Sequence, residues 1–572
     1  MSQLSTLYRS LVAGTICAVL VLAFGIADAA LFFRGNLQAF FPVAVGFAVF
    51  GFLLQVLVIG TLTRLRYTHG TSQEASLVIL AAMLFDVQAR VTGDALLPTA
   101  LMLIVISGVT LGVALLLCGA FKLGRYIRLM PFAMVAGFLA GSGLLMVSFS
   151  VAVLHGESVG VADLVQGASP QAIWKVLAGV AMGLVLIGLS AARWSEYTLP
   201  AVIVGGVVAF HVVVAQTPIS IDALVADNWT MATDAVSVAY QPLTADLFRQ
   251  VDWQTLAVVS PQLVSLVAVC IFANLIKISS LELMMRQRVD ENRELRVAGY
   301  AGLLSGALAV APGFHGLSNS SIILRLSGNA KIAAVVTAAV TVGVLALAGD
   351  SLILMPRFVF GAILLWVGYA MIHDSLVANV GKVRTRESVV TAAIALTVTV
   401  LGPLPGLAFG VLCGLVMFVT DYAQQETVRS FQSAAELHSN VDRGTEARQW
   451  LNRHGESVRV VRLHSYLFFG SAARSVEAIM RHLDTLTPRR VEILVLDFSR
   501  VVGIDSTALR AFQRLALRTE TDHTVIWAAA APPDVRLAFE KDGNGAVARF
   551  FQTLDFALEA AEEQLLGSRT DA

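Results

Sequence analysis

Charged side chains are scarce in this chain of 572 residues: Asp, Glu, Lys and Arg make up 14% of it, whereas 56% of its residues are hydrophobic. Soluble domains carry about 25% charged residues. The shortage excludes an ordinary soluble protein and indicates an integral membrane protein. The 40 basic and 40 acidic residues also balance, so the chain has no basic excess for binding nucleic acid.

Cysteine is also rare, and no catalytic pattern is present. Cys17, Cys118, Cys270 and Cys413 lie far apart in apolar runs, without metal-ligand or disulfide spacing. The sequence has no P-loop, metal cluster or nucleophile constellation. We therefore expect no metal, no cofactor and no enzymatic activity. Residues 1–30 lack a small-residue cleavage site, so we expect no signal peptide.

Apolar runs dominate the first 421 residues, and the third and tenth runs are short. Each short run is the third in its group of seven. A matching irregularity in both halves is typical of an inverted repeat with a binding site at the repeat interface. The fourteen runs are 8–32, 38–62, 71–85, 96–120, 127–150, 172–190, 199–215, 256–280, 294–311, 318–326, 330–349, 354–373, 387–401 and 403–421.

Lysine and arginine fall unevenly on the loops between these runs, which predicts the orientation of the chain. With the N-terminus in the cytoplasm, the even-numbered loops are cytoplasmic and carry most of the positive charge. Those loops hold Arg64, Arg66, Lys122, Arg125, Arg128, Arg193, Arg286, Arg288, Arg293, Arg296, Arg325, Lys331, Lys382, Arg384 and Arg386, against Arg34, Arg90, Lys175, Arg249 and Arg357 outside.

The stretch 289–331 carries the clearest functional pattern. A charged segment, 290–296, leads into an apolar run of small residues that breaks at Pro312-Gly313. A polar cluster at 315–321 precedes an apolar piece at 322–326, which is too short to span a bilayer because a span needs about 20 residues. The pattern predicts a discontinuous transporter helix whose N-terminus points unpaired N–H groups at a ligand near the midplane.

This stretch resembles the SulP (SLC26) family of anion transporters, through VD-NREL at 289–295, LLSG at 303–306, Pro312-Gly313, Ser318-x-Ser320 and Gly328. The resemblance implies a UraA/SLC26-like fold, a polytopic α-helical 7+7 inverted repeat, and a homodimer. The transport domain would cover 1–421, with segments 1–4 and 8–11 as a core and segments 5–7 and 12–14 as a gate.

In the resembled family, an anion sits between the N-termini of the third and tenth helices. Two sets of unpaired N–H groups and two positive dipole ends can hold an anion without a fixed countercharge. The structural alternative is that Ser and Thr side chains only cap these helices. The expected substrate-binding residues are Thr71, Ser72, Gln73, Glu74, Asn274, Ser318, Asn319 and Ser320.

Family members that run with a cation usually place an acid in the eighth segment, where this chain has Ala273 and Asn274. Lys277, one helical turn on, is expected to snorkel or to be an interior charge near the cytoplasmic side. Coupling to a proton or sodium ion would then use another group. The candidates are Asp28 deep in the first segment, Glu74 in the first turn of the third helix, and His315.

After Asp421 the composition becomes polar. Residues 422–456 are expected to be a helical linker, and 457–567 a cytoplasmic α/β domain. LVLDFSRVVGIDSTALRAF, 494–512, resembles the STAS signature, in which Ser506 and Thr507 would be candidate regulatory phosphorylation sites. The expected strands are 458–463, 466–469, 491–498 and 524–530, and the expected helices 471–486, 506–518, 537–540 and 554–566.

The sequence thus predicts a secondary transporter of a small anion of the sulfate, bicarbonate or dicarboxylate class, with proton coupling as an open option, in a bacterial-type inner membrane with both termini cytoplasmic. The partners expected are the anion, a co-transported proton or sodium ion, membrane lipid and a second copy of the chain. Three alternatives remain open: a nucleobase-type carrier, whose acids in segments eight and ten are absent, an uncoupled anion channel, and a STAS-linked sensor or scaffold without transport.

Overall fold

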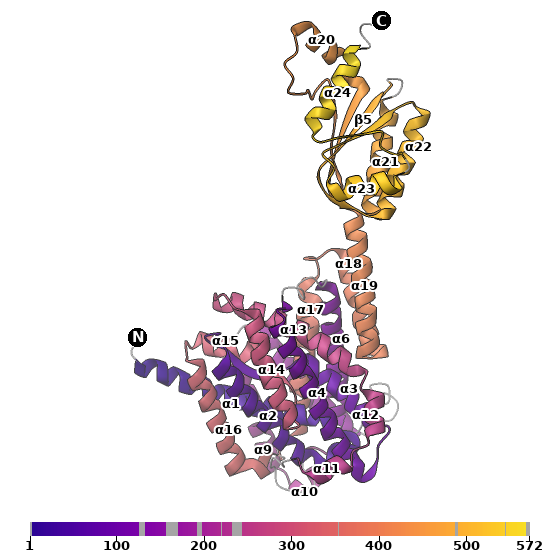
Figure 1. Cartoon of the computed structure of the whole chain (residues 1–572). Helices are drawn as coiled ribbons and strands as arrows, with labels where there is room; N and C mark the ends of the chain where they lie inside the picture. The colour runs from indigo at the N-terminus through magenta and orange to yellow at the C-terminus, as the bar shows by residue number, and fades with distance from the viewer. Residues whose placement is uncertain are drawn as a thin grey trace. The chain divides into compact units, whose positions relative to one another are not determined.

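The computed structural model describes residues 3–124, 132–155, 170–191, 197–218, 220–230, 243–352, 354–486, 490–543 and 545–567. Arg125, Arg128 and Arg193, used above for the orientation, lie outside these residues. The chain divides into two compact units, Met1–Gly414 and Leu415–Ala572 (Figure 1). Each unit is described by itself.

Helices make up the first unit. Within the described residues, ten are long and apolar enough to span a membrane. They are α1 (Gln3–Phe32), α2 (Phe41–Leu62), α4 (Leu96–Ala120), α6 (Phe132–His155), α8 (Pro170–Ala191), α9 (Thr198–Ala215), α13 (Gln262–Met285), α16 (Ala330–Leu352), α17 (Arg357–Ser375) and α19 (Pro403–Ala423).

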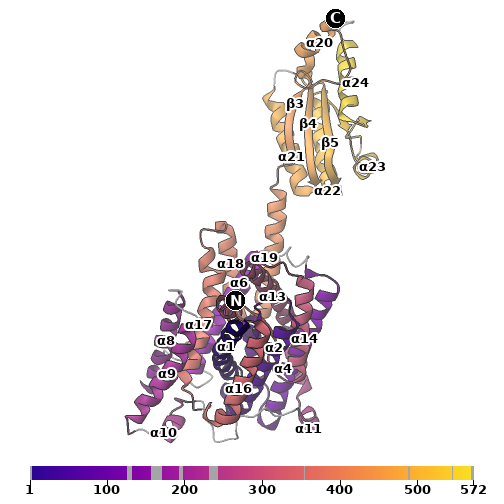
Figure 2. The same ribbon diagram turned by 90° about the vertical axis from the view of Figure 1, so that its left-hand side faces the viewer.

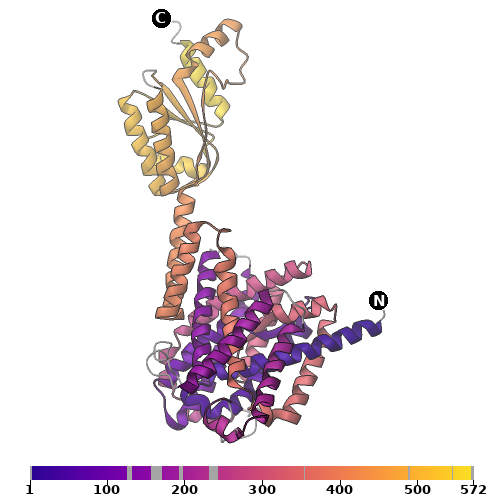
Figure 3. The ribbon, with the colours of Figure 1, turned by 180° about the vertical axis from the view of Figure 1, so that it is seen from behind.

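Four shorter helices lie where the remaining predicted segments fall: α3 (Glu74–Gln88), α14 (Glu291–Ala307), α15 (Leu317–Arg325) and α18 (Thr385–Leu401). The connection 216–255 holds α10 (Ile221–Ala226) and α11 (Ala245–Arg249), and α12 (Trp253–Val259) follows it. The first turns of α1 extend beyond the neighbouring helices (Figure 3), and their apolar side chains, such as Leu4 and Tyr8, are exposed.

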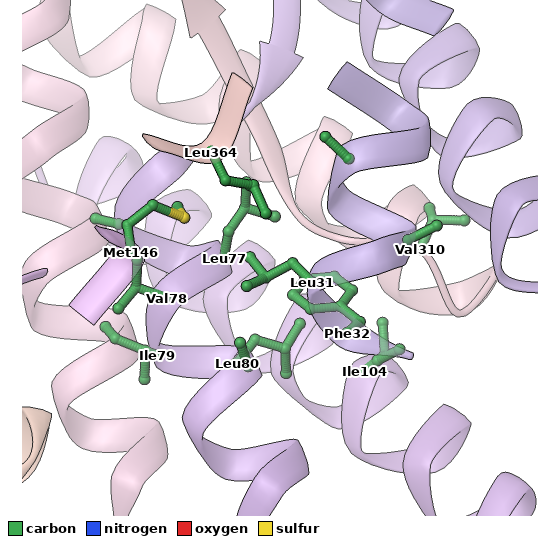
Figure 4. Packing of buried hydrophobic residues seen from close by; sticks show 14 of the residues in the cluster. Leu31, Phe32, Leu77, Val78, Ile79, Leu80, Ile104, Met146, Val310 and Leu364 are labelled. Atoms are coloured by element: carbon green, nitrogen blue, oxygen red, sulfur yellow. The ribbon is translucent and has the colours of Figure 1, made fainter. Parts of the chain in front are cut away.

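The half-length helix α3 lies inside the first unit. Its residues Leu77 to Leu80 are buried in one cluster with side chains of α1, α4, α6 and α17 (Figure 4). Irregular backbone at membrane depth is tolerated only where protein, rather than lipid, surrounds it. The helices around α3 provide that environment, and so permit the chain to leave helical geometry just before Glu74.

Close contacts between helix backbones depend on glycine. A Cβ added at Gly112 of α4 would lie 2.5 Å from the backbone nitrogen of Leu303 in α14, which no real Cβ does. Gly137 and Gly141 of α6 allow an equally close approach, because a Cβ there would lie 2.7–2.8 Å from carbonyl oxygens of α18. Small residues let helices approach closely in membranes, where packing rather than the hydrophobic effect drives association.

The second unit is built on one sheet with the order β3-β4-β5-β6-β7, in which β3 is antiparallel to β4 and the other pairs are parallel. Helices cover both faces: α21, α22 and α23 pack on one and α24 on the other. Figure 2 shows α21 and α24 on opposite sides of the strands. The elements are β3 (Val428–Ser433), α20 (Thr445–His454), β4 (Val458–Leu467), α21 (Phe469–Thr485), β5 (Ile493–Ile504), α22 (Ser506–Thr521), β6 (Val525–Ala529), α23 (Pro533–Asp542), β7 (Arg549–Phe551) and α24 (Leu554–Gly567).

Two local expectations for this unit are wrong. The stretch 422–456 is not only a helical linker, because β3 lies within it and pairs with β4 at the edge of the sheet. The strands expected at 458–463 and 466–469 are one strand, β4. Its turn-like sequence corresponds to a bulge, where Ser465 adopts a φ of 69° and the register to β5 shifts.

We predict that Gly112→Ala lowers the stability of the first unit by about 1–3 kcal/mol, the usual cost of overpacking, because the new methyl would collide with the α14 backbone. Thermal unfolding of the detergent-solubilised protein measures the change. Gly343→Ala in α16 is the control, since a Cβ there would have no described atom within 4 Å. Equal shifts in both variants would contradict the role of Gly112.

Candidate anion-binding site

A two-stranded ribbon joins the starts of the two half-helices. β1 (His69–Ser72) pairs antiparallel with β2 (Gly313–Gly316), so that His69 lies opposite Gly316 and Ser72 opposite Gly313. Helix α3 begins just after β1, and α15 directly after β2. The two helix starts therefore lie at opposite ends of the ribbon. Because a strand rises ~3.3 Å per residue, the ends of these four-residue strands are about 10 Å apart.

Neither half-helix is capped by a side chain. The N-cap residues are Gln73 for α3 and Gly316 for α15, and neither accepts a hydrogen bond from the first turn through a side chain. The capping alternative is thus wrong in the described structure. The first-turn N–H groups, with the positive ends of the two helix dipoles, remain suited to an anion.

One face of α13 lies along the start of α3 and the ribbon. Gln73 Nε2 donates to the carbonyl oxygen of Cys270 at 3.2 Å. Seven residues on, the Lys277 ammonium pairs with the Glu74 carboxylate and lies 4.0 Å from the ring centroid of Phe314. Residues spaced by three and four share one helix face, so this face presents a cation to α3 and β2.

Asn274 lies on the same face, between the two contacts to α3. Its side chain is fully buried, yet neither its amide nitrogen nor its oxygen has a hydrogen-bond partner among the described residues. Buried polar groups are nearly always paired, and leaving one unpaired costs about 1–3 kcal/mol. An amide kept at this cost has the properties of a ligand-binding group.

Lys277 was expected to snorkel or to be an interior charge. Its pairing with Glu74 at the start of α3 was not predicted from the sequence. Its side chain is 22% exposed and that of Glu74 is 35% exposed, so the pair is partly open to solvent. The sequence feature that could have indicated this contact is the spacing of Asn274 and Lys277, which places both residues on one face of the helix.

Asp28 approaches the ribbon from α1. It is 4% exposed, and Ser72 Oγ donates to its Oδ2 at 2.7 Å. Both side chains line a cavity of about 20 Å³ together with Gln55 of α2. Gln55 Nε2 donates to the carbonyl oxygen of Ala311 at 2.5 Å, while its Oε1 has no partner among the described residues. The cavity has room for about one water molecule.

His315 does not join these residues, because its Nε2 contacts Glu294 Oε2 of α14 at 2.9 Å. Both side chains are buried, and Glu294 also accepts from Thr63 Oγ1 at 2.7 Å and from the Arg64 backbone at 3.2 Å. The pair ties β2 to α14 and to the end of α2. The structure thus gives His315 a tertiary contact away from the helix starts.

The remaining predicted site residues differ in whether their side chains are buried or accessible. Ser320 is buried, accepts from the His69 backbone at 3.0 Å and donates to the carbonyl oxygen of Gly316. Asn319 is buried with its Nδ2 3.4 Å from His69 Nδ1. Ser318 is exposed and Thr71 half-buried, so these two hydroxyls are accessible near the ribbon.

In the second unit, Ser506 and Thr507 are exposed in the first turn of α22, whose N-cap is Asp505. Asp505 Oδ1 accepts from the backbone nitrogen of Ala508 at 2.6 Å, and its Oδ2 accepts from that of Phe469 at 3.2 Å. The two hydroxyls are accessible, and their modification stays a prediction.

Comparison with protein families identifies the chain. Residues 7–394 match the model of the sulfate permease family, and residues 449–557 match the STAS domain. The chain belongs to the sulfate permease family. The resemblance to SulP proteins, and to STAS domains, is thereby confirmed.

Among curated relatives of this chain, the "Vacuolar basic amino acid transporter VSB1" of Saccharomyces cerevisiae is 25% identical over 490 residues, 83% of this chain but 47% of the yeast protein. The chain therefore spans about half the length of that relative. The "Bicarbonate transporter BicA" of Picosynechococcus sp. is 22% identical over 547 residues, 94% of this chain and 90% of the relative.

Solved structures show the same fold. The murine "Solute Carrier 26 family member A9 (Slc26a9) anion transporter in the inward-facing state" matches with a TM-score of 0.67 at 16% identity, over 97% of this chain and 91% of that one. The transmembrane domain of cyanobacterial BicA matches with a TM-score of 0.55 at 18% identity, over 71% and 97%. The predicted SLC26-like membrane fold with an α/β STAS domain is confirmed.

We predict that Asn274→Leu raises the unfolding temperature of the substrate-free permease but abolishes substrate binding. Leucine has a similar volume and removes the buried, unpaired amide, whose cost is about 1–3 kcal/mol. Thermal unfolding and uptake by proteoliposomes measure the two effects. As a control on the same helix, Gln262→Leu should lower the unfolding temperature, because the Gln262 amide donates to Asp86 at 2.6 Å. A destabilised Asn274→Leu protein would contradict the unpaired state.

Proposed function

We propose that this permease is a secondary transporter of a small anion, which binds between the starts of α3 and α15 beside Asn274 and Lys277. The observation that carries the proposal is the pair of uncapped half-helix starts joined by one ribbon. Helix N-termini bind anions because their N–H groups and dipoles point outward. Helices of segments 1–4 and 8–11 would move as a core against segments 5–7 and 12–14.

The charge balance around Lys277 supports coupling to protons. The Lys277 ammonium pairs with the Glu74 carboxylate, and the two charges cancel. A proton taken up by Glu74 removes its charge and releases Lys277 for a charge-assisted hydrogen bond to the substrate. The site then binds one proton with one monovalent anion, and its net charge stays unchanged.

The names of the relatives support an anion of the bicarbonate or sulfate class, since two relatives are called BicA and one "Putative sulfate transporter YvdB" of Bacillus subtilis. Sulfate, bicarbonate, chloride and dicarboxylates form the test panel. The protein would be a homodimer in a bacterial-type inner membrane, with lipid around its helices and both termini in the cytoplasm. Family membership supports the dimer, and the Lys and Arg bias supports the orientation.

A basic amino acid is the second candidate substrate, favoured by two carboxylates near the start of α3. Its carboxylate would bind the helix starts, and its cationic side chain would pair with Glu74 or Asp28. The yeast relative is named for such substrates. Uptake of radiolabelled arginine, compared with sulfate and bicarbonate in the same proteoliposomes, separates the two candidates.

We predict that Lys277→Gln raises the KM for the anion about tenfold or more, because hydrogen bonds to charged groups contribute about 1.5–3 kcal/mol. Initial uptake rates over a range of anion concentrations measure this. Lys382→Gln, which removes an exposed lysine, is the matched control. An unchanged KM in Lys277→Gln would remove the ammonium from the site, and faster arginine uptake would favour the second candidate.

We predict that uptake by the wild-type permease falls as the pH rises, whereas Glu74→Gln takes up the anion at a rate that hardly depends on pH. Glutamine resembles the protonated carboxyl and cannot hold Lys277 in an ion pair. Uptake with an imposed proton gradient or voltage measures the coupling. Asp246→Asn, at an exposed site in α11, is the control. A pH profile equal to the wild type would exclude Glu74, and flux insensitive to the proton gradient would favour a channel.

A further inference from the structure

A second cavity lies away from the ribbon, at the end of the membrane unit where α2 ends and α14 begins. Its volume is about 280 Å³. One wall is the chain after α2, and the other is the connection from α13 into α14. The lining residues are Arg64, Leu65, Gln287, Arg288, Val289, Asp290, Arg293 and Glu294. The Lys and Arg bias assigns this end to the cytoplasm.

Side chains hold the two walls in a fixed arrangement. Gln287 Oε1 accepts from the backbone nitrogen of Arg66 at 3.3 Å, and its Nε2 donates to the carbonyl oxygen of Arg64 at 3.0 Å. Glu294 Oε1 accepts from the Arg64 backbone at 3.2 Å. Segments more than 200 residues apart in sequence are thus joined by three hydrogen bonds. The cavity is preformed.

The carboxylates of the cavity already have donors. Asp290 caps α14 by accepting from the backbone nitrogens of Asn292 and Arg293, at 3.1 and 3.2 Å. Glu294 accepts from Thr63, from the Arg64 backbone and from His315. Neither carboxylate forms an ion pair with an arginine of the cavity among the described residues.

Three of the lining residues are arginines, Arg64, Arg288 and Arg293, and none of them forms an ion pair in the described part of the chain. Arg293 Nη2 donates to the carbonyl oxygen of Leu62 at 3.3 Å, but its Nε is buried and has no acceptor among the described residues. A buried donor without an acceptor is costly. Neither lining carboxylate pairs with these three arginines in the described part of the chain, so their positive charge is available to an added anion.

We propose that this cavity binds a phosphate group, from free phosphate or from the headgroup of a phosphorylated lipid, through Arg64, Arg288 and Arg293. Guanidinium groups match the spacing of phosphate oxygens and donate two hydrogen bonds at once. The volume of about 280 Å³ exceeds the ~30 Å³ that one water occupies in the liquid, so a phosphate and several waters fit. This site is independent of the proposed transport function.

The test uses the purified full-length protein with Lys277→Gln as the background, so that binding at the ribbon is weakened. Titration calorimetry with inorganic phosphate measures affinity. Arg64→Gln and Arg293→Gln should each weaken binding about tenfold, the effect of one lost charge-assisted hydrogen bond. Arg293→Lys keeps the positive charge but cannot donate two parallel hydrogen bonds. Its phosphate affinity should lie between that of the background protein and that of Arg293→Gln. Arg66→Gln is the control, because that exposed side chain lies over Tyr67, outside the cavity lining.

Hydrogen exchange locates the site independently: phosphate should slow exchange at 64–66 and 287–294. Liposomes of phosphatidylcholine with and without a phosphatidylinositol phosphate distinguish the source of the phosphate group. Slowed exchange only with this lipid assigns a headgroup, and slowed exchange with free phosphate in plain liposomes assigns the soluble ion. Equal phosphate affinity in Arg64→Gln, Arg293→Gln and Arg66→Gln, or unchanged exchange in all arms, would overturn the proposal.

Discussion

The antiparallel pairing of β1 with β2 is the constraint on which the membrane unit depends. At membrane depth no solvent is present to satisfy backbone N–H and C=O groups that leave helical geometry. The ribbon supplies those partners for two segments at once. It also lies directly against α2, because a Cβ at Gly70 or Gly313 would collide with Gln55. The two half-helices can then begin in the interior with open first turns.

Charges in the unit follow the same rule of local pairing. The Lys277 ammonium pairs with the Glu74 carboxylate, and His315 contacts the Glu294 carboxylate. Asp28 accepts a hydrogen bond from Ser72. Asn274 and the Nε of Arg293 are among the buried groups without partners in the described part of the chain, as are Gln55 Oε1 and His315 Nδ1. Unpaired buried groups cost free energy that packing elsewhere must offset. Asn274 and Arg293 are the two that lie where a ligand is proposed to bind.

The sequence revealed the broken helices well but not what joins them. Pro312-Gly313, the polar cluster after it and the shortness of two apolar runs predicted both half-helices near their observed positions. The ribbon escaped prediction because its strands are four residues each, too short for an alternating pattern. The partner of Lys277 was not predicted because the position of Glu74 depends on how α3 packs against α13. The edge strand β3 was missed since its sequence, VRSFQS, is largely polar.

Glu294 connects the cavity of arginines to the ribbon. Its carboxylate forms part of the cavity lining, holds the Arg64 backbone and contacts His315, which is two residues before the start of α15. An anion bound in the proposed arginine cavity would change the electric field at Glu294, and the contact between Glu294 and His315 would connect that change to β2. Binding linkage is reciprocal, so any factor by which phosphate alters substrate affinity must equal the factor by which substrate alters phosphate affinity.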